Sequence, residues 1–305
     1  MPVYLPQLSR REFLRRAAVA GAALAFSPSA FAELSAKPRD PDTFFFLSDT
    51  HIAADAATIS SDVNMTDHLT SVVREVMAWP VAPAAIFISG DLAFKRGLPG
   101  DYAAFGKLIE PLRALAPIHL LLGNHDERGN FWKSFPLDAT PLAAVPQKQV
   151  SVVSSARAHW VLLDSLDITA TTPGRLGEAQ IKWLALKFKA LADRPVIVVC
   201  HHPLDTMMGL LGGLLDTPAF MEELAHHPQV KSFIHGHTHN WQTSTLDQGL
   251  QVINLPPTAY VFKSGRPSGW VRAQLASAGA EFELRCLNPK HPEHAQIKKL
   301  LWRAG

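Results

Sequence analysis

Five short apolar runs, each followed closely by Asp, Asn or His, constrain the fold of this 305-residue chain more than any other feature. The runs are rich in Phe, Ile, Leu and Val and lead into turn residues, which is typical of buried strands. Ligands of open α/β sheets lie at the carboxyl ends of strands, so we expect the polar residues to meet at one edge. The runs are residues 43–47, 84–88, 118–122, 196–199 and 230–234, and the polar segments are 48–51, 90–91, 123–126, 200–203 and 235–239.

The connections between the first three runs have helical spacing. Apolar residues recur at helical intervals over residues 65–78, which predicts an amphipathic helix. A second helix is predicted over residues 101–115, bent or broken at Pro111, because proline lacks the amide that a helix interior needs. The order strand, helix, strand, helix, strand favours parallel strands with helical crossovers.

The second half of the chain has a different pattern. The β-like runs at 149–154 and 159–164 predict a hairpin, and helices are predicted at 178–190 and 218–226. The β-like runs within 241–287 are assigned to a second sheet. We therefore predict an α/β fold, a four-layer α/β/β/α sandwich with two packed mixed β-sheets and helices outside.

Both ends of the chain are expected to lie outside this domain. Arg10 and Arg11 precede an apolar run too short to span a bilayer, and Ala32 ends a small-residue cleavage point. The order resembles a bacterial twin-arginine signal peptide, which implies a periplasmic or secreted protein that meets the twin-arginine translocon during export. A basic tail with a chance Ala-rich helix is the alternative. The expected division is a signal peptide at 1–32 cleaved near Ala32, a linker at 33–42, the domain at 43–288 without a transmembrane segment, and a polar tail with a possible terminal helix at 289–305.

Composition argues against two kinds of chemistry. The net charge of +2 gives no electrostatic reason to expect nucleic acid as a bulk partner. Cys200 and Cys286 lie far apart in strand-like apolar positions and form no CxxC metal motif. Two buried thiols are favoured, with one disulfide as the alternative.

The polar residues after the apolar runs form a candidate metal-binding set. Carboxylates mixed with imidazoles suit Mn, Fe, Zn or Co better than Mg or Ca. Two divalent transition-metal ions close together need a shared ligand, and a carboxylate is the natural bridge, so we place Asp91 at the centre. Asp49 and His51 are two residues apart, which points both side chains the same way in an extended segment. The candidate ligands are Asp49, His51, Asp91, Asn124, His201, His237 and His239.

Five sequence blocks carry a family resemblance. Asp-x-His, Gly-Asp, Gly-Asn-His-Asp, His-His-Pro and Gly-His-x-His occur in this order between Asp49 and His239. They resemble the calcineurin-like metallophosphoesterase superfamily, in particular its bacterial cyclic-nucleotide and glycerophosphodiester phosphodiesterase branch. The resemblance implies a dinuclear metal centre that hydrolyses a small phosphoester substrate. Purple acid phosphatases have a metal-binding Tyr three residues after the bridging Asp, and Phe94 at that position implies a site without tyrosinate colour.

The resemblance also implies roles for individual residues. His125 would face the substrate phosphate, and Asn124 would share the developing charge. Asp126 would orient His125, or alternatively cap the following helix. A metal-bridging hydroxide would attack the phosphodiester in line, without a covalent intermediate. One metal would take Asp49, His51, Asp91 and His239, the other Asp91, Asn124, His201 and His237, with His202 packed behind them.

Alternative functions use the same site. A phosphomonoesterase or pyrophosphohydrolase would need the same metals, whereas a catalytically silent scaffold of this fold would typically have lost ligands, and every ligand position is filled here. The export signal favours glycerophosphodiesters, lipid head groups or extracellular nucleotides over intracellular cyclic nucleotides.

Two further features lie outside the motifs. The apolar, glycine-rich segment 204–215 is either a mobile lid that selects a hydrophobic leaving group or a short buried helix or dimer contact. His119 and His235 are expected in the core. The remaining histidines, His68, His159, His226, His227, His291 and His294, are expected to face solvent or lie at helix ends.

Overall fold

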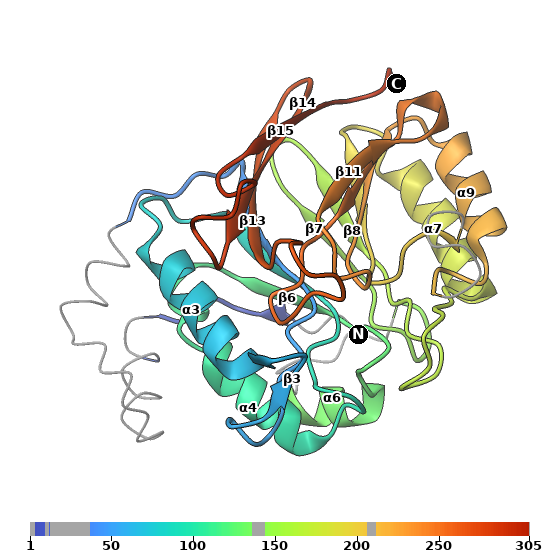
Figure 1. The fold of residues 1–305 in the computed structure, drawn as a ribbon. Coiled ribbons are helices and arrows are strands. Elements are labelled where there is room, and N and C mark those ends of the chain that lie inside the picture. The colour runs from blue at the N-terminus through green and yellow to red at the C-terminus, as the bar shows by residue number, and fades with distance from the viewer. Residues whose placement is uncertain (1–3, 10–11, 13–36, 136–143, 206–211, 305) are drawn as a thin grey trace.

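The computed structural model describes residues 4–9, 12, 37–135, 144–205 and 212–304, and most of their strands belong to two large mixed sheets (Figure 1). This confirms the predicted fold class. The first sheet has the order β1 (Tyr4–Leu5), β6 (Ile118–Leu121), β5 (Ala85–Ser89), β2 (Thr43–Leu47), β13 (Gly269–Ala276), β14 (Gly279–Cys286) and β15 (Ile297–Leu301). The second has the order β11 (Gln242–Thr245), β12 (Gln251–Asn254), β10 (Val230–His235), β9 (Val196–Val199), β8 (His159–Leu162) and β7 (Ser151–Ser154), and β3 (Ile59–Ser60) pairs with β4 (Val63–Asn64).

The alternation of side chains along β2 explains the layers. Phe44 and Phe46 point into the core between the two sheets, while Phe45 and Leu47 point into the core under the first set of helices. Successive residues of a strand face opposite sides, so a fully apolar strand can fill two cores at once. A third core lies between the second sheet and the remaining helices. Three cores separate four layers.

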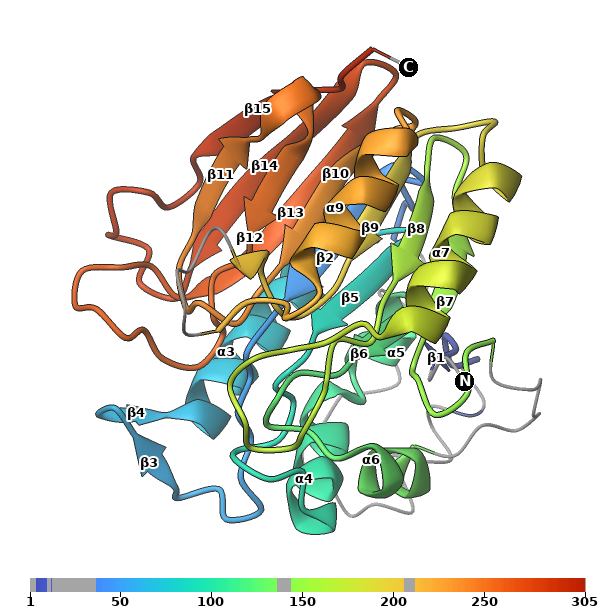
Figure 2. The ribbon, with the colours of Figure 1, turned by 90° about the vertical axis from the view of Figure 1, so that its right-hand side faces the viewer.

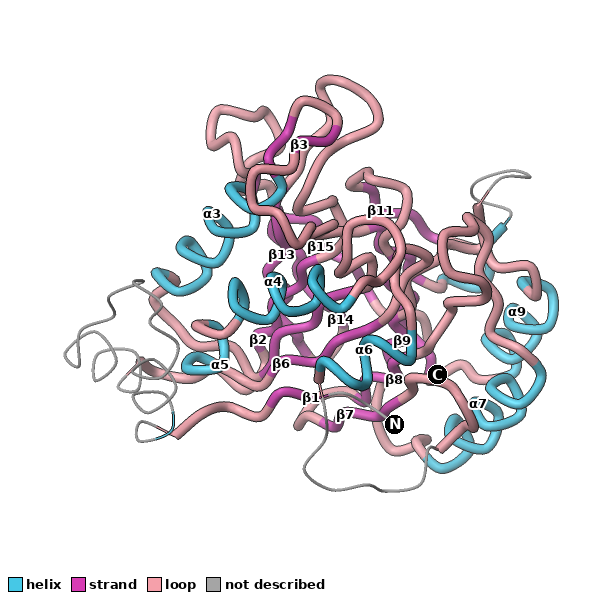
Figure 3. Tube along the Cα trace, turned by 90° about the horizontal axis from the view of Figure 1, so that it is seen from below, coloured by secondary structure: helices cyan, strands magenta, loops and turns pink. Residues whose placement is uncertain are grey.

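Helices cover the two outer faces of the sheets (Figures 1 and 3). Asn64 caps α3 (Met65–Ala78) by accepting a hydrogen bond from the amide of Asp67, and Pro111 separates α4 (Pro99–Ile109) from α5 (Leu112–Leu115), as predicted. Figure 2 shows α7 (Glu178–Ala190) and α9 (Thr217–His226) in front of the second sheet. On the first sheet lie α3, α4 and α5, with α6 (Arg128–Ser134) packed on α4; on the second lie α7 and α9.

The later β-like runs do not form the second sheet by themselves, contrary to the prediction. β11 and β12 extend the second sheet, but β13 pairs with β2 and β14 pairs with β13 in the first. The second sheet is completed by β7, β8, β9 and β10. The reason is that sheet membership depends on which distant strand offers an edge, and the local alternation is the same in either sheet.

The two ends of the chain also differ from the prediction. A strand, β15, forms in the tail where a helix was considered possible, because the exposed edge of β14 offers it hydrogen bonds. At the other end, β1 pairs antiparallel with the edge strand β6, and Leu8 is buried. Residues 4–9 therefore pack on the domain in this structure, although the segment 1–32 was expected to lie outside it.

Two smaller predictions concern cysteine and membranes. Cys200 and Cys286 are both buried free thiols, as favoured by the sequence. None of the helices in the described ranges combines the length and the apolarity needed to cross a bilayer.

Candidate metal centre

The strand ends bring together six of the seven candidate ligands, and the seventh, Asn124, follows the end of β6. β2, β5 and β6 are parallel in the first sheet, and β9 and β10 are parallel in the second, so the polar segments that follow them meet at one edge. Every one of the seven is buried, with His237 the most exposed at 7%. Polar groups buried in this way need partners or ions. Six of them fall in groups of three whose ligand atoms lie within 4.8 Å of one another, and two of these groups also include His202 or His125.

The first group joins the two i, i+2 pairs of the sequence. Nε2 of His51 lies 3.0 Å from Nε2 of His239. Nε2 of His239 is 3.5 Å from Oδ1 of Asp49. Two imidazole nitrogens this close form a hydrogen bond only if one of them carries a proton. A cation bound between the two nitrogens and the carboxylate would accept the lone pairs of both.

The second group is centred on His201. Its Nε2 lies 3.3 Å from Oδ2 of Asp91 and 3.3 Å from Nδ1 of His237. Oδ2 of Asp91 is also 3.7 Å from Nε2 of His51, so this carboxylate reaches both groups. Oδ1 of Asn124 is buried and accepts no hydrogen bond within the described part of the chain. A buried amide oxygen without a hydrogen-bond partner fits a metal ligand.

Backbone carbonyls fix the orientation of three of the imidazoles. Nδ1 of His201 contacts the carbonyl of Ser89 at 2.7 Å, and Nδ1 of His239 contacts that of Tyr260 at 2.5 Å. Nδ1 of His51 contacts the carbonyl of Phe94 at 3.3 Å. A carbonyl accepts only from N–H, so the proton sits on Nδ1 and the lone pair of Nε2 points to the cluster.

The backbone at these positions is unusual. Asp91 lies in the left-handed region, which costs a residue with a side chain roughly 1–2 kcal/mol. Hydrogen bonds between neighbouring strand ends hold the turns, as when the amide of His51 donates to the carbonyl of Asp91. Such strain persists only where the surroundings enforce it, and it concentrates at functional sites. The ligand candidates with positive φ are Asp49 (52°), His51 (47°), Asp91 (48°), His237 (68°) and His239 (52°).

The motif glycines leave room for the ligands. A Cβ on Gly123 would lie 2.2 Å from Oδ1 of Asp91, and one on Gly90 would lie 2.7 Å from Nδ1 of His201. Gly90 also has a φ of +86°, which glycine adopts without strain. The Gly in Gly-Asp and in Gly-Asn-His-Asp is therefore required by the close approach of the two sheets at this edge.

Charges within the cluster shift the pKa values in opposite directions. Burial lowers the pKa of His201, but Asp91 and Asp49 outweigh it and raise that pKa to about 9. Burial raises the pKa of Asp91, and His201 and His51 outweigh it and hold that pKa well below its usual value. Burial and the neighbouring His201 lower the pKa of His237 to about 3. Without a metal, one protonated imidazole takes the place of a cation.

His125 faces the cluster, but Asp126 does not orient it as predicted. The half-buried His125 ring packs edge-on against His51 at a centroid distance of 4.9 Å, and its Nδ1 is buried with no partner in the described ranges. The Asp126 carboxylate instead accepts hydrogen bonds from the amides of Leu92, Ala93 and Gly123 and from the Tyr102 hydroxyl.

The alternative role for Asp126 is also wrong. The side chain of Glu127 caps α6 by accepting from the amides of Gly129 and Asn130. Asp126 therefore ties the loop after β5 to the loop after β6. Burial, reinforced by Asp91, raises the pKa of Asp126 to about 7 against the effect of its amide donors.

Sequence reasoning missed the residues that surround the ligands. The Tyr260 ring stacks on His51 at a centroid distance of 5.2 Å, and the Phe262 ring stacks on His239 at 4.0 Å. Tyr102 supports Asp126 through its hydroxyl. An aromatic residue followed by Lys263 in a Gly/Pro-rich loop was the available signal for Phe262, whereas a carbonyl contact such as that of Tyr260 leaves no trace in the side-chain sequence.

Among the histidines outside the ligand set, one differs from the prediction in whether it is buried or faces solvent. His159 was expected to face solvent but is buried, because its ring bridges Ser154 and Asp193 at 2.8 Å each. His119 and His235 are buried, as predicted. His202 is buried with Nδ1 2.8 Å from the Ser165 hydroxyl, and it offers a ligand atom within 4.8 Å of those of His201 and His237.

Half of the segment 204–215, expected to be either a lid or a short buried helix or dimer contact, lies outside the described residues. Met207 and Met208 fall in 206–211, so the predictions for this segment stay predictions. Its flanks are described: Leu204 and Leu214 are fully buried and Leu215 is exposed.

The fold is shared with solved phosphatases. The chain superimposes on a dimetal phosphatase from Danio rerio with a TM-score of 0.66 and 15% identity, covering 86% of this chain and 100% of that one. It superimposes on a purple acid phosphatase from yellow lupin with a TM-score of 0.62 and 14% identity, covering 85% of this chain and 52% of that one. Fold and site together define a metallophosphoesterase.

The chain belongs to the calcineurin-like phosphoesterase family, whose profile matches residues 43–241. It is 28% identical over 249 residues to a cAMP/cGMP dual specificity phosphodiesterase of Mycobacterium tuberculosis, covering 79% of this chain and 75% of the relative. It is 23% identical to a glycerophosphodiester phosphodiesterase of Enterobacter lignolyticus, covering 70% and 76%. The predicted family and enzyme class are confirmed.

Proposed function

We propose that this protein is a dinuclear-metal-dependent phosphodiesterase that hydrolyses a small phosphodiester. The observation that carries the proposal is the position of Asp91, whose Oδ2 lies 3.7 Å from Nε2 of His51 and 3.3 Å from Nε2 of His201. One carboxylate oxygen between two imidazole groups is the arrangement that a pair of ions requires. Relatives named as phosphodiesterases support a diester over a monoester.

The residues present fit two divalent ions of Mn, Fe, Zn or Co. The donors are imidazole nitrogens and carboxylate or amide oxygens, which suit these metals. Ions bound there would offset the charge of the phosphate oxygens and supply a water that is nucleophilic near neutral pH. One ion would be held by Asp49, His51, Asp91 and His239, and the other by Asp91, Asn124, His201 and His237.

The remaining residues would act on the substrate. An imidazole N–H of His125 is free to donate to a phosphoryl or leaving oxygen, since its Nδ1 has no partner among the described residues. Asp126 would act indirectly, because its hydrogen bonds hold the loops that carry Asp91 and His125 in position. The main-chain amide of His125 donates to Oδ1 of Asp91 at 2.8 Å and leaves Oδ2 for the ions.

The decisive experiment compares diester and monoester substrates. Protein reconstituted with Mn²⁺ should hydrolyse bis(nitrophenyl) phosphate faster than nitrophenyl phosphate, and chelator or Asp91→Ala should abolish both activities. Faster hydrolysis of the monoester would point to a phosphomonoesterase instead. Equal rates for wild type and Asp91→Ala would refute an enzymatic role of the site.

We also propose that the enzyme is exported through the twin-arginine route to the periplasm or the exterior. The support is the order of Arg10 and Arg11, the apolar run and Ala32. Because Tyr4 and Leu5 pair with β6 in the structure, export with cleavage and retention with β1 in place are alternative fates. Replacing both arginines with lysine should keep the protein in the cytoplasm, and a mature N-terminus upstream of Ala32 would contradict the cleavage site.

A further inference from the structure

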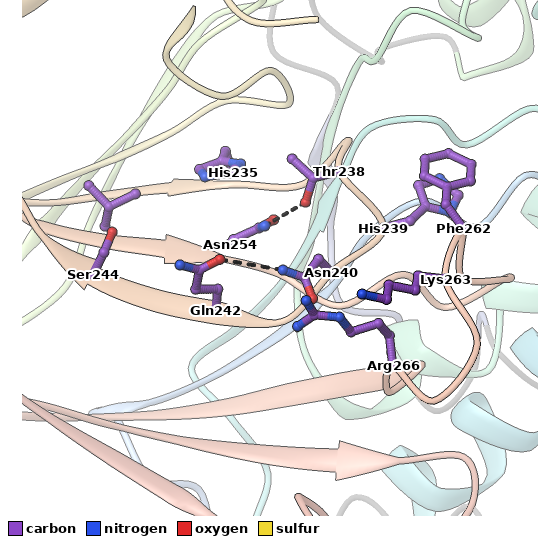
Figure 4. Close-up of a pocket in the computed structure, with 11 residues that line it drawn as sticks. His235, Thr238, His239, Asn240, Gln242, Ser244, Asn254, Phe262, Lys263 and Arg266 are labelled. Carbon is purple, nitrogen blue, oxygen red and sulfur yellow. Dashed lines mark hydrogen bonds between the residues drawn. The ribbon is translucent and has the colours of Figure 1, made fainter. Parts of the chain in front are cut away.

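A cavity of about 490 Å³ opens beside the candidate metal centre and is distinct from the ligand cluster itself. It is bounded by β10, β11, β12 and the loop that carries Phe262, and His239 lies at its boundary with the ligands (Figure 4). The volume lies in the range of small-molecule sites. The cavity therefore offers room for the part of a substrate that does not react.

The buried wall of this cavity presents hydrogen-bond acceptors without partners. Nδ1 of the buried His235 contacts the carbonyl of Gly236 at 3.0 Å and so carries the proton, which leaves Nε2 as an acceptor. That Nε2 is buried and unpartnered within the described residues, as is Oδ1 of Asn254, whose Nδ2 donates to Thr238. Buried acceptors of this kind are expensive to leave unpaired, so they point to a ligand that donates hydrogen bonds.

The opposite wall is cationic and aromatic. Lys263 and Arg266 reach toward Asn240, and the residues that the structure describes around the cavity include no carboxylate to balance them (Figure 4). Phe262 is 70% exposed although it stacks on His239 at 4.0 Å, so one face of its ring is covered and the other is open. The exposed Phe262 ring stacks on the ligand candidate His239 and lies in the same loop as Lys263 and Arg266, which fits a contact with substrate.

We propose that this cavity is a specificity subsite for the alcohol part of the diester, and that it selects an alcohol rich in hydroxyl or amino donors that carries a further negative charge. This inference rests on the proposed function, because the scissile phosphate must lie at the metal centre. The donors meet His235 and Asn254, and the additional anion meets Lys263 and Arg266. A nucleoside and a sugar or polyol share this chemistry.

The test uses two nitrophenyl diesters of thymidine monophosphate, with and without an extra phosphate on the far sugar hydroxyl. We expect the extra phosphate to raise kcat/KM about tenfold, the effect of roughly 1.4 kcal/mol from charge-assisted contacts. Lys263→Ala/Arg266→Ala should remove this advantage. The control Lys107→Ala/Lys290→Ala removes the same charge from exposed positions elsewhere and should leave it intact.

A second variant tests the acceptor wall. His235→Phe keeps a ring that can pack on Phe233, whose centroid is 5.6 Å away, but it has no acceptor. It should lower kcat/KM for both thymidine diesters about fivefold more than it lowers kcat/KM for bis(nitrophenyl) phosphate, which is the loss of one hydrogen bond to substrate. Stronger inhibition by thymidine bisphosphate or by glucose bisphosphate, weakened in Lys263→Ala/Arg266→Ala, would identify the source as nucleoside or sugar.

The outcomes separate the two proposals. If Mn²⁺-loaded wild type does not hydrolyse bis(nitrophenyl) phosphate, the proposed function fails whatever the cavity does. If it hydrolyses that diester but the extra phosphate gives no advantage, or the advantage survives Lys263→Ala/Arg266→Ala, the subsite is overturned and the function stands.

Discussion

The two sheets contribute different chemistry to the same centre. The first sheet offers mostly oxygen atoms as ligand candidates at the ends of β2, β5 and β6, whereas the second offers only imidazoles at the ends of β9 and β10. Asp91 on the first sheet is the carboxylate that reaches imidazoles of both groups. We call the candidates on the first sheet the oxygen side and those on the second sheet the nitrogen side. The oxygen side would supply negative charge to bound ions, and the nitrogen side would supply neutral ligands.

The division makes the centre dependent on how the sheets pack. The candidate ligands of the two sheets meet beside the core in which Phe44, Phe46 and Trp160 pack the sheets together. Variants of a ligand candidate on each sheet compare the two halves, although contacts such as that of the His237 amide with the Asp49 carboxylate cross between the sheets.

The largest effect is expected from breaking the oxygen side. Asp91→Ala should lose both ions and lower kcat by roughly a thousandfold or more, the loss of several kcal/mol of charge stabilisation. His237→Ala on the nitrogen side should retain one ion and lose less activity. Metal content by plasma mass spectrometry and kcat on bis(nitrophenyl) phosphate check both, and loss of both ions from His237→Ala would contradict the division.

The next effect is the pH dependence of thermal stability, compared between metal-free and metal-loaded protein. The pKa of His201 is raised to about 9, above its ordinary 6.5, so in the metal-free protein its stabilising charge pair is fully present below 6.5 and is lost as pH rises through 9. Metal-free protein should therefore unfold at a lower temperature at pH 9 than at pH 6.5. Metal-loaded protein, where the ion replaces that proton, should show a smaller drop, and equal drops in calorimetry would contradict this assignment.

A third effect tests the contact between the sheets. Gly90→Ala places a Cβ 2.7 Å from the His201 ring at a φ of +86°, so strain and clash add, and about 2–4 kcal/mol of stability should be lost. Gly265→Ala is the matched control, because its φ is +82° with nothing within 4 Å of the new Cβ. Chemical denaturation should show a clearly smaller loss for the control, and equal losses would exclude the clash.

The smallest effect concerns the support beneath the oxygen side. Tyr102→Phe removes the hydroxyl that donates to Asp126 and accepts from the amide of Glu127 at 2.8 Å, which should cost about 1–2 kcal/mol of stability. Because Asp126 keeps its three amide donors, kcat should fall only a few-fold. In protein that retains its N-terminal segment, Tyr4→Phe, at an exposed ring, should change neither quantity.

The sequence predicted the ligand-bearing strands well because their information is local. Each apolar run and its polar end lie within ten residues or fewer, and the spacing of Gly90 and Asp91 already implies a tight turn. The same is true of α7, whose bounds match the prediction. A strand and its turn are specified by neighbouring side chains.

The misses have a common physical cause in long-range pairing. β13 joins the first sheet through β2, more than two hundred residues earlier, and no local pattern encodes that choice. Asp126 was misread for the same reason: its donors lie on Tyr102 and on amides of another loop. The strand β15 depends on the edge of β14, since Lys298 and Lys299 carry no sign of it.

The main-chain carbonyls behind His51, His201 and His239 have a consequence for how such a centre can evolve. Main-chain carbonyls set the proton position on each ring, so the side chains of Phe94, Ser89 and Tyr260 are not needed for it. Drift at these positions can reshape the surroundings of the site while the electronic character of its imidazoles is inherited unchanged.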